Sequence, residues 1–221
     1  MSHAAASAPR EVLAFHLAFG LLTLPVVLYA EGTLYGTGVL VLAVLYNLAL
    51  PGYALFRRHH DWLARWAFLL PVSIGQVLPD WALVDIAGTL QFPDHGVARI
   101  GDAVPLYFMG LWIMLLFPVT LLADASGRLR YPVVILLGGS LFAVAEWAAP
   151  MLRLWQPVDT PTRFGIAPYT VAAEILLCIA CLWAYRNARY HGVLARLWSA
   201  VMIVGFYTGA LMISLLMFGG H

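Results

Sequence analysis

Long apolar stretches recur along the chain and are separated by short polar segments. A helix that spans a bilayer needs about 20 mostly apolar residues, and seven stretches meet that requirement. They cover residues 11–30, 34–56, 62–90, 104–123, 131–150, 168–186 and 194–217. The pattern predicts an all-α integral membrane protein with seven transmembrane helices in a single domain, residues 1–221.

The seven predicted helices pair into three hairpins followed by a closing seventh helix. The third stretch is too long for a perpendicular span and contains Pro71 and Pro79. Because proline removes a helix hydrogen bond, we expect this helix to be tilted or kinked. The first stretch resembles a signal peptide that ends at Ala30, but its apolar run exceeds a typical h-region, so we interpret it as the first helix.

The composition indicates that lipid is the solvent of this chain. Hydrophobic residues make up 62% and charged residues 10% of the sequence, whereas about a quarter of a soluble domain is charged. A net charge of +1 and the lack of a basic run argue against a nucleic-acid partner. All 12 Lys+Arg residues are arginine, so no lysine can form a Schiff base and a retinal photoreceptor is excluded.

Arginine is distributed unequally between the two predicted sides of the membrane. Nine of the 12 arginines fall on one side, and only Arg99, Arg153 and Arg163 fall on the other. The positive-inside rule assigns the richer side to the cytoplasm. The N-terminus is therefore predicted to be cytoplasmic and the C-terminus external.

Two segments of the chain resemble each other. Residues 80–82 (Asp-Trp-Ala) and 146–148 (Glu-Trp-Ala) each end an outward-going helix, and each precedes a polar loop. The chain then re-enters the membrane at Pro105 and Pro168, respectively. We interpret the second and third hairpins as a parallel repeat, with a chance match as the alternative.

Ionisable residues inside the spans are the candidates for chemistry, because each costs about 2.5–3.5 kcal/mol on insertion scales. Four acids on three helices lie at comparable depth in the outer half, and we expect them to surround one cavity. They are Asp80, Asp85, Glu146 and Glu174. Burial and mutual repulsion favour the protonated form of at least one of them. A neutral acid beside an ionised one suits general acid–base catalysis.

Asp80 is the deepest of these acids and is the expected essential acid, with the other three assisting it. Gln76 precedes Asp80 by four residues, so the two share a helix face and the amide is expected to orient the carboxyl group. In the alternative interpretation, the acids pair with Arg99, Arg153 and Arg163 or cap helix ends.

Aromatic residues at the same level are predicted to bind the substrate. Aromatic faces can stabilise a carbocation, and an interfacial aromatic belt is the alternative. The predicted substrate-binding set is Gln76, Trp81, Tyr107, Trp112, Trp147 and Tyr169. No cluster has zinc-ligand spacing and no aspartate-rich motif for magnesium-bound diphosphate is present, so neither a metal nor another cofactor is expected.

Three features follow one another between Asp80 and Glu174. They are an acid that closes a helix, a loop with glycine and aromatic residues, and the run at 103–106 (Ala-Val-Pro-Leu) that leads to Trp112. This arrangement resembles a family of bacterial membrane proteins of carotenoid and terpenoid biosynthesis, which includes carotenoid hydratases and, more distantly, membrane-bound terpene cyclases. The resemblance implies that a carboxylic acid protonates a carbon–carbon double bond or epoxide, and that water or ring closure captures the cation. It also implies a lipid-soluble isoprenoid substrate and a bacterial cytoplasmic membrane.

Two other classes of function stay open at this point. In a proton- or cation-coupled transporter the same buried carboxylates would exchange protons or bind a cation. A non-catalytic membrane sensor or assembly factor is the third class. A polar cavity open sideways to lipid favours the enzyme, whereas one that reaches both aqueous faces favours transport.

Overall fold

The computed structural model describes residues 3–219. Within this range, seven helical spans are long and apolar enough to cross a membrane, which confirms the predicted number and the all-α class. They are Pro9–Tyr29, Gly32–Phe56, His60–Ile86, Phe108–Ala125, Gly127–Ala148, Pro168–Ala188 and Val193–Phe218. Each end lies within about four residues of its predicted position.

The spans are built from eight α-helices and are joined by short turns or by loops with minimal strands. The α-helices are α1 (His3–Tyr29), α2 (Gly32–Phe56), α3 (His60–Gly75), α4 (Val77–Trp81), α5 (Phe108–Ala125), α6 (Arg130–Ala148), α7 (Pro168–Ala188) and α8 (Val193–Phe218). The strands are β1 (Leu90–Gln91), β2 (Arg99–Ile100), β3 (Val104–Pro105) and β4 (Gln156–Pro157).

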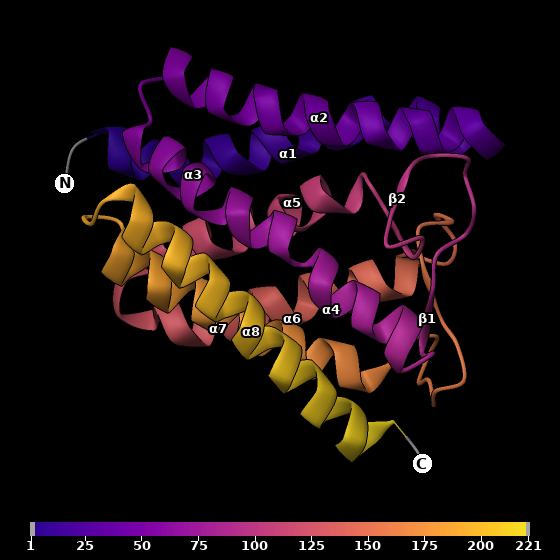
Figure 1. Ribbon diagram of the computed structural model, residues 1–221. Helices are drawn as coiled ribbons and strands as arrows, with labels where there is room; N and C mark the ends of the chain where they lie inside the picture. The colour runs from indigo at the N-terminus through magenta and orange to yellow at the C-terminus, as the bar shows by residue number, and fades with distance from the viewer. Residues whose placement is uncertain (1–2, 220–221) are drawn as a thin grey trace.

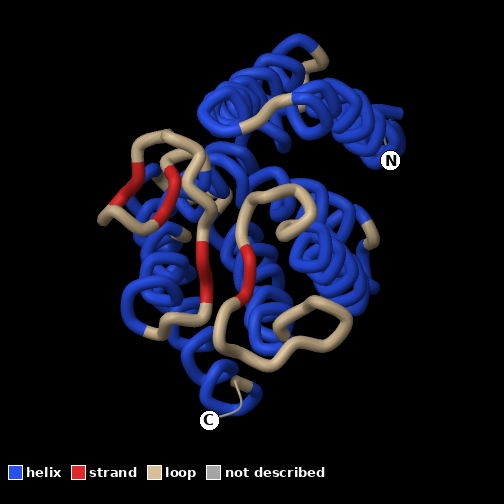
Figure 2. The backbone as a smooth tube through the Cα atoms, turned by 90° about the vertical axis from the view of Figure 1, so that its right-hand side faces the viewer, coloured by secondary structure: helices blue, strands red, loops and turns tan. Residues whose placement is uncertain are grey.

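Five of the spans form a closed ring. α3 packs on α5, α5 on α6, α6 on α7 and α7 on α8, and α8 closes the ring against α3 and α4. α1 and α2 pack on each other and contact the ring through α3 and α5, so they lie side by side along one flank of the bundle (Figures 1 and 2). Leu17 and Leu21 of α1 are exposed, as expected for a helix that is apolar all round and faces lipid.

The third span is interrupted at Gln76, between α3 and α4. Pro79 has no backbone N–H to donate to the carbonyl of Gly75, and its ring crowds that carbonyl. The expected kink is therefore confirmed, and Pro79 explains its position, whereas Pro71 lies inside the uninterrupted α3. After α4 the span ends in a π-helical turn, Ala82–Ile86.

Two long loops cover one end of the ring. β1 from the first loop pairs antiparallel with β4 from the second, and β2 pairs with β3 within the first loop (Figure 2). Pro105 lies in β3 and α5 begins only at Phe108, which corrects the predicted start of this helix at 104. Pro168 does begin α7, as expected. The two re-entries of the hypothesised repeat therefore differ, because strand pairing holds the first proline in an extended loop.

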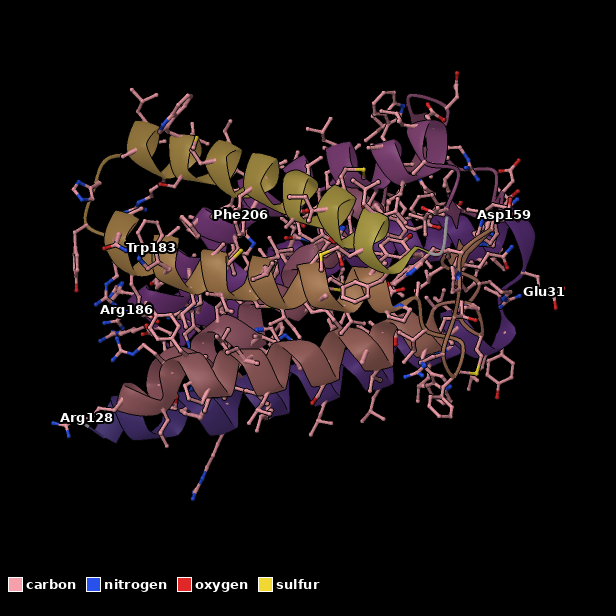
Figure 3. The ribbon with its side chains drawn as sticks, turned by 90° about the horizontal axis from the view of Figure 1, so that it is seen from below. Glu31, Arg128, Asp159, Trp183, Arg186 and Phe206 are labelled. Atoms are coloured by element: carbon pink, nitrogen blue, oxygen red, sulfur yellow. The ribbon has the colours of Figure 1, made fainter. Side chains whose placement is uncertain are left out.

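The two ends of the bundle differ in charge. Arg128 and Arg186 lie at one end, and Glu31 and Asp159 lie at the other (Figure 3). α1 begins at the arginine-rich end and α8 finishes at the opposite, loop-covered end (Figure 1), as an odd number of spans requires.

Candidate functional site

A cavity inside the ring lies in the half of the bundle nearer the long loops. It encloses about 50 Å³, which is room for a few water molecules. Its polar lining includes three carboxyl groups from three different helices: Asp80 of α4, Glu146 of α6 and Glu174 of α7. The rest of the wall is mainly aromatic and aliphatic, with contributions from α5, α8 and both loops.

The three acids converge because their helices meet at the same level. Glu146 lies in the last turn of α6 and Glu174 in the second turn of α7, so the α6–α7 hairpin brings them to similar depth. Asp80 follows the helix break of the third span. All three side chains are buried, with exposed fractions of 4% for Asp80, 6% for Glu146 and 3% for Glu174. The predicted convergence holds for these three acids.

The three carboxyl groups have different hydrogen-bond partners. Trp112 Nε1 donates to Asp80 Oδ2 at 3.1 Å, and Trp155 Nε1 donates to Glu146 Oε1 at 3.1 Å. Glu174 Oε2 is buried and has no hydrogen-bond partner among the described residues. A donated hydrogen bond stabilises a carboxylate, so Asp80 and Glu146 receive a stabilisation that this oxygen of Glu174 lacks.

The arginines at the loop-covered end do not pair with these acids. Arg99 donates to backbone carbonyls of its own loop, and Arg153 donates to the carbonyls of Val27 and Ala30 at the end of α1. Every salt bridge formed within the described residues lies at the opposite, arginine-rich end. The alternative in which the acids are structural ion-pair partners is therefore wrong for this conformation.

Asp85 and Gln76 lie outside the cavity, which corrects their predicted places. Asp85 is exposed in the π-helical turn Ala82–Ile86, whose period differs from that of α4, so its side chain does not follow the cavity face of Asp80. Gln76 is fully buried, but neither amide atom has a hydrogen-bond partner among the described residues. The group that orients Asp80 is the indole of Trp112.

Of the predicted aromatic set, only Trp112 lines the cavity. Trp147 is 53% exposed, since it directly follows an inward-facing acid and points about 100° away. Trp81 is half-buried and packs beside the loop. Tyr107 and Tyr169 are buried, and the Tyr169 hydroxyl donates to Thr89 Oγ1 at 3.1 Å.

Several lining residues were not predicted. Phe142 and Thr170 each precede a cavity acid by four residues, so the helix period alone could have revealed them. Tyr207 on α8 and Trp155 in the second loop reach the cavity only through the tertiary fold. The Trp112 ring lies 5.6 Å from the Phe142 ring and 5.6 Å from the Tyr207 ring, measured between centroids.

Within residues 3–219, no group of three or more His, Cys, Asp or Glu side chains is arranged to hold a metal ion. Cys178 and Cys181 are buried free thiols in α7.

Comparison with known sequences identifies the family of this chain. Residues 77–218, more than half of the chain, match the family model described as Domain of unknown function (DUF6989). The chain belongs to the DUF6989 family. No curated protein and no solved structure matches it. In this DUF6989 protein every cavity-lining residue falls within the matched range, whereas α1, α2 and α3 precede it.

Proposed function

We propose that this DUF6989 protein is a membrane enzyme that uses acid–base catalysis on a lipid-soluble isoprenoid, in the hydration or cyclisation of a carotenoid or terpenoid. The observation that carries the proposal is the set of three buried carboxyl groups in one aromatic-lined cavity, with no arginine paired to any of them. Intramembrane acids without such partners are expensive and mark functional sites.

The proposed proton donor is Glu174, in place of Asp80, which the sequence suggested as the essential acid. An ionised carboxylate that is buried without donors is costly, and Glu174 Oε2 has none among the described residues. Asp80 and Glu146 each accept an indole N–H, which favours their charged form and supports a basic role.

In hydration, the Glu174 carboxyl group transfers its proton to one carbon of a double bond, and the other carbon becomes a cation. A water molecule adds its oxygen to that carbon while Asp80 accepts a proton from the water, assisted by Glu146. Return of this proton to Glu174 restores the enzyme, and the net change is addition of one water. In cyclisation, a second double bond of the substrate captures the cation instead, and the base removes a neighbouring proton.

The aromatic lining supports a cationic intermediate. Aromatic faces attract a cation, and the attraction is largest where water is excluded. Trp112, Phe142 and Tyr207 supply neighbouring rings at the cavity.

The cavity volume restricts how such a substrate would bind. A space of about 50 Å³ is far below the roughly 300–1,000 Å³ of typical ligand pockets, so the substrate must displace side chains and leave most of its length in lipid. Leu111 and Leu115 of α5 line the cavity and are only half-buried. We propose that the reactive end enters past this wall.

Proton- or cation-coupled transport is the second candidate, because unpaired buried carboxyls also suit proton exchange. The lining residues come from the loop-side half of the spans, whereas alternating-access sites lie near the midplane. This off-centre position supports the enzyme over the carrier.

The test is mass spectrometry of lipid extracts from an isoprenoid-producing host that expresses the wild type, Glu174→Gln, or the control Glu31→Gln. Glu31 is an exposed acid at the start of α2 and makes no side-chain capping bond. We expect a hydrated or isomeric isoprenoid with the wild type and the control, and its loss with Glu174→Gln. Identical extracts from all strains, with proton flux in reconstituted liposomes, would favour the carrier.

A further inference from the structure

A second recess opens at the arginine-rich end of the bundle, away from the carboxyl cavity. It measures about 470 Å³, within the range of about 300–1,000 Å³ found for ligand pockets. α3, α5, α7 and the turn between α2 and α3 form its walls. Its charged lining consists of Arg58, Arg65, Arg186, Arg189, Asp61 and Asp124. Arg186 marks this end in Figure 3.

The two carboxylates of the recess do not balance its four guanidinium groups. Asp124 accepts hydrogen bonds from Arg65 and Arg186 and lies 3.9 Å from Arg189 Nη1. Asp61 accepts from Arg65 at 3.2 Å. The four guanidinium groups against the two carboxylates leave an excess of two positive charges.

Arg65 carries buried hydrogen-bond donors that no group of residues 3–219 satisfies. Its side chain is 1% exposed, and its guanidinium carbon lies 4.1 Å from the centre of the Tyr185 ring. Nη2 bonds to both aspartates, but Nε and Nη1 are buried and have no partner among the described residues. Buried donors are normally satisfied, so these two N–H groups indicate that an acceptor-rich ligand completes the recess.

Arg58 is a further cation of the recess that is not engaged. It is exposed, and its side chain makes no ion pair or hydrogen bond within the described part of the chain. It adopts φ +60° in the turn between α2 and α3, a conformation that a non-glycine residue rarely takes.

We propose that this recess binds a phosphate-bearing anion, either the headgroup of an anionic phospholipid in the adjacent leaflet or a soluble phosphate compound. Guanidinium forks match the geometry of phosphate oxygens, and the excess of two positive charges offsets the charge of a phosphate group. Basic recesses between transmembrane helices are suited to anionic lipid headgroups. The proposal is independent of the catalysis proposed for the carboxyl cavity.

The experiment uses the full-length protein, purified and stripped of lipid in detergent. Thermal unfolding and native mass spectrometry are recorded with phosphatidylglycerol, with the zwitterionic control phosphatidylcholine, and with inorganic phosphate or diphosphate. The variants are Arg58→Gln and Arg189→Gln. The control is Arg128→Gln, which removes an exposed arginine at the same end (Figure 3) but outside the recess.

We expect Arg58→Gln and Arg189→Gln each to weaken binding by about five-fold, in line with the contribution of one arginine near anionic lipid. Arg128→Gln should leave the affinity unchanged, and added salt should weaken binding throughout. Stabilisation by phosphatidylglycerol alone identifies a lipid headgroup, and stabilisation by phosphate or diphosphate identifies a soluble ligand. Equal binding of phosphatidylcholine, an equal loss with Arg128→Gln, or no binding of any probe would overturn the proposal.

Discussion

Asp80 and Asp85 lie five residues apart on the third span and have opposite surroundings. Asp80 is buried in the cavity wall and accepts a hydrogen bond from Trp112. Asp85 is exposed. Since the same chemical change can be made at both positions, the pair separates the effect of the cavity from the effect of a carboxyl group in general.

Asp80→Asn should lower product formation by about 10²–10⁴-fold, the usual contribution of a general acid or base. The amide keeps the shape and can still accept the Trp112 hydrogen bond, so folding should persist. Asp85→Asn should leave turnover unchanged. The measurement is product formation by purified, monodisperse variants in nanodiscs. Similar turnover in both variants would remove Asp80 from the mechanism.

At the scale of the element, the break in the third span leaves a buried amide without partners. Gln76 has neither its donor nor its acceptor satisfied by the described residues, and such a group costs about 1–3 kcal/mol. Gln76→Leu should therefore raise the thermal unfolding temperature in detergent. The matched control is Asn47→Leu, which should lower it, because the Asn47 amide donates to Ala43 and Gly110 carbonyls.

A lower unfolding temperature for Gln76→Leu would mean that the amide has a partner, such as a water molecule. In that case a loss of activity in the same variant would restore Gln76 to the site.

Arg153 links the second long loop to the peripheral helix pair, beside a hydrogen bond that the Tyr35 hydroxyl of α2 donates to the Leu152 carbonyl. Arg153 donates to the carbonyls of Val27 and Ala30, and its guanidinium carbon lies 4.6 Å from the centre of the Tyr35 ring. Arg153→Gln should destabilise the fold by about 1.5–3 kcal/mol, the value of hydrogen bonds from a charged donor.

The control is Arg163→Gln, which changes an exposed arginine of the same loop. Comparing the denaturation midpoints of the two variants measures the difference in stability. Equal midpoints would show that the tie contributes nothing.

For the whole molecule, the difference in arginine content between the two ends predicts its orientation. The arginine-rich end should face the cytoplasm, which places the start of α1 inside and the end of α8 outside. We expect a C-terminal alkaline phosphatase fusion to be active and a fluorescent-protein fusion to be dark. Bright cytoplasmic fluorescence without phosphatase activity would reverse the orientation.

The sequence predicts the spans because a 20-residue apolar run has few alternatives in lipid. It also predicts that Asp80, Glu146 and Glu174 share a cavity, since their depth follows from helix length. The direction of each side chain is harder to predict. Trp147 directly follows the inward-facing Glu146 and points away, as helical rotation requires. Asp85 is exposed because it lies in the π-helical turn beyond Asp80. The contributions of Trp155 and Tyr207 depend on a loop and on the last helix, and no local pattern marks either.

Closure of the ring by α8 also has a consequence for synthesis. α8 contacts α3, α4 and α7 and supplies Tyr207 to the cavity, yet it is the last of the seven spans to leave the ribosome. Until it docks, Glu174 and Asp80 border an open seam that faces the bilayer. A chain stalled before α8 would therefore leave these two carboxyl groups uncovered on that side of the ring, and we expect the cell's quality-control proteases to degrade it.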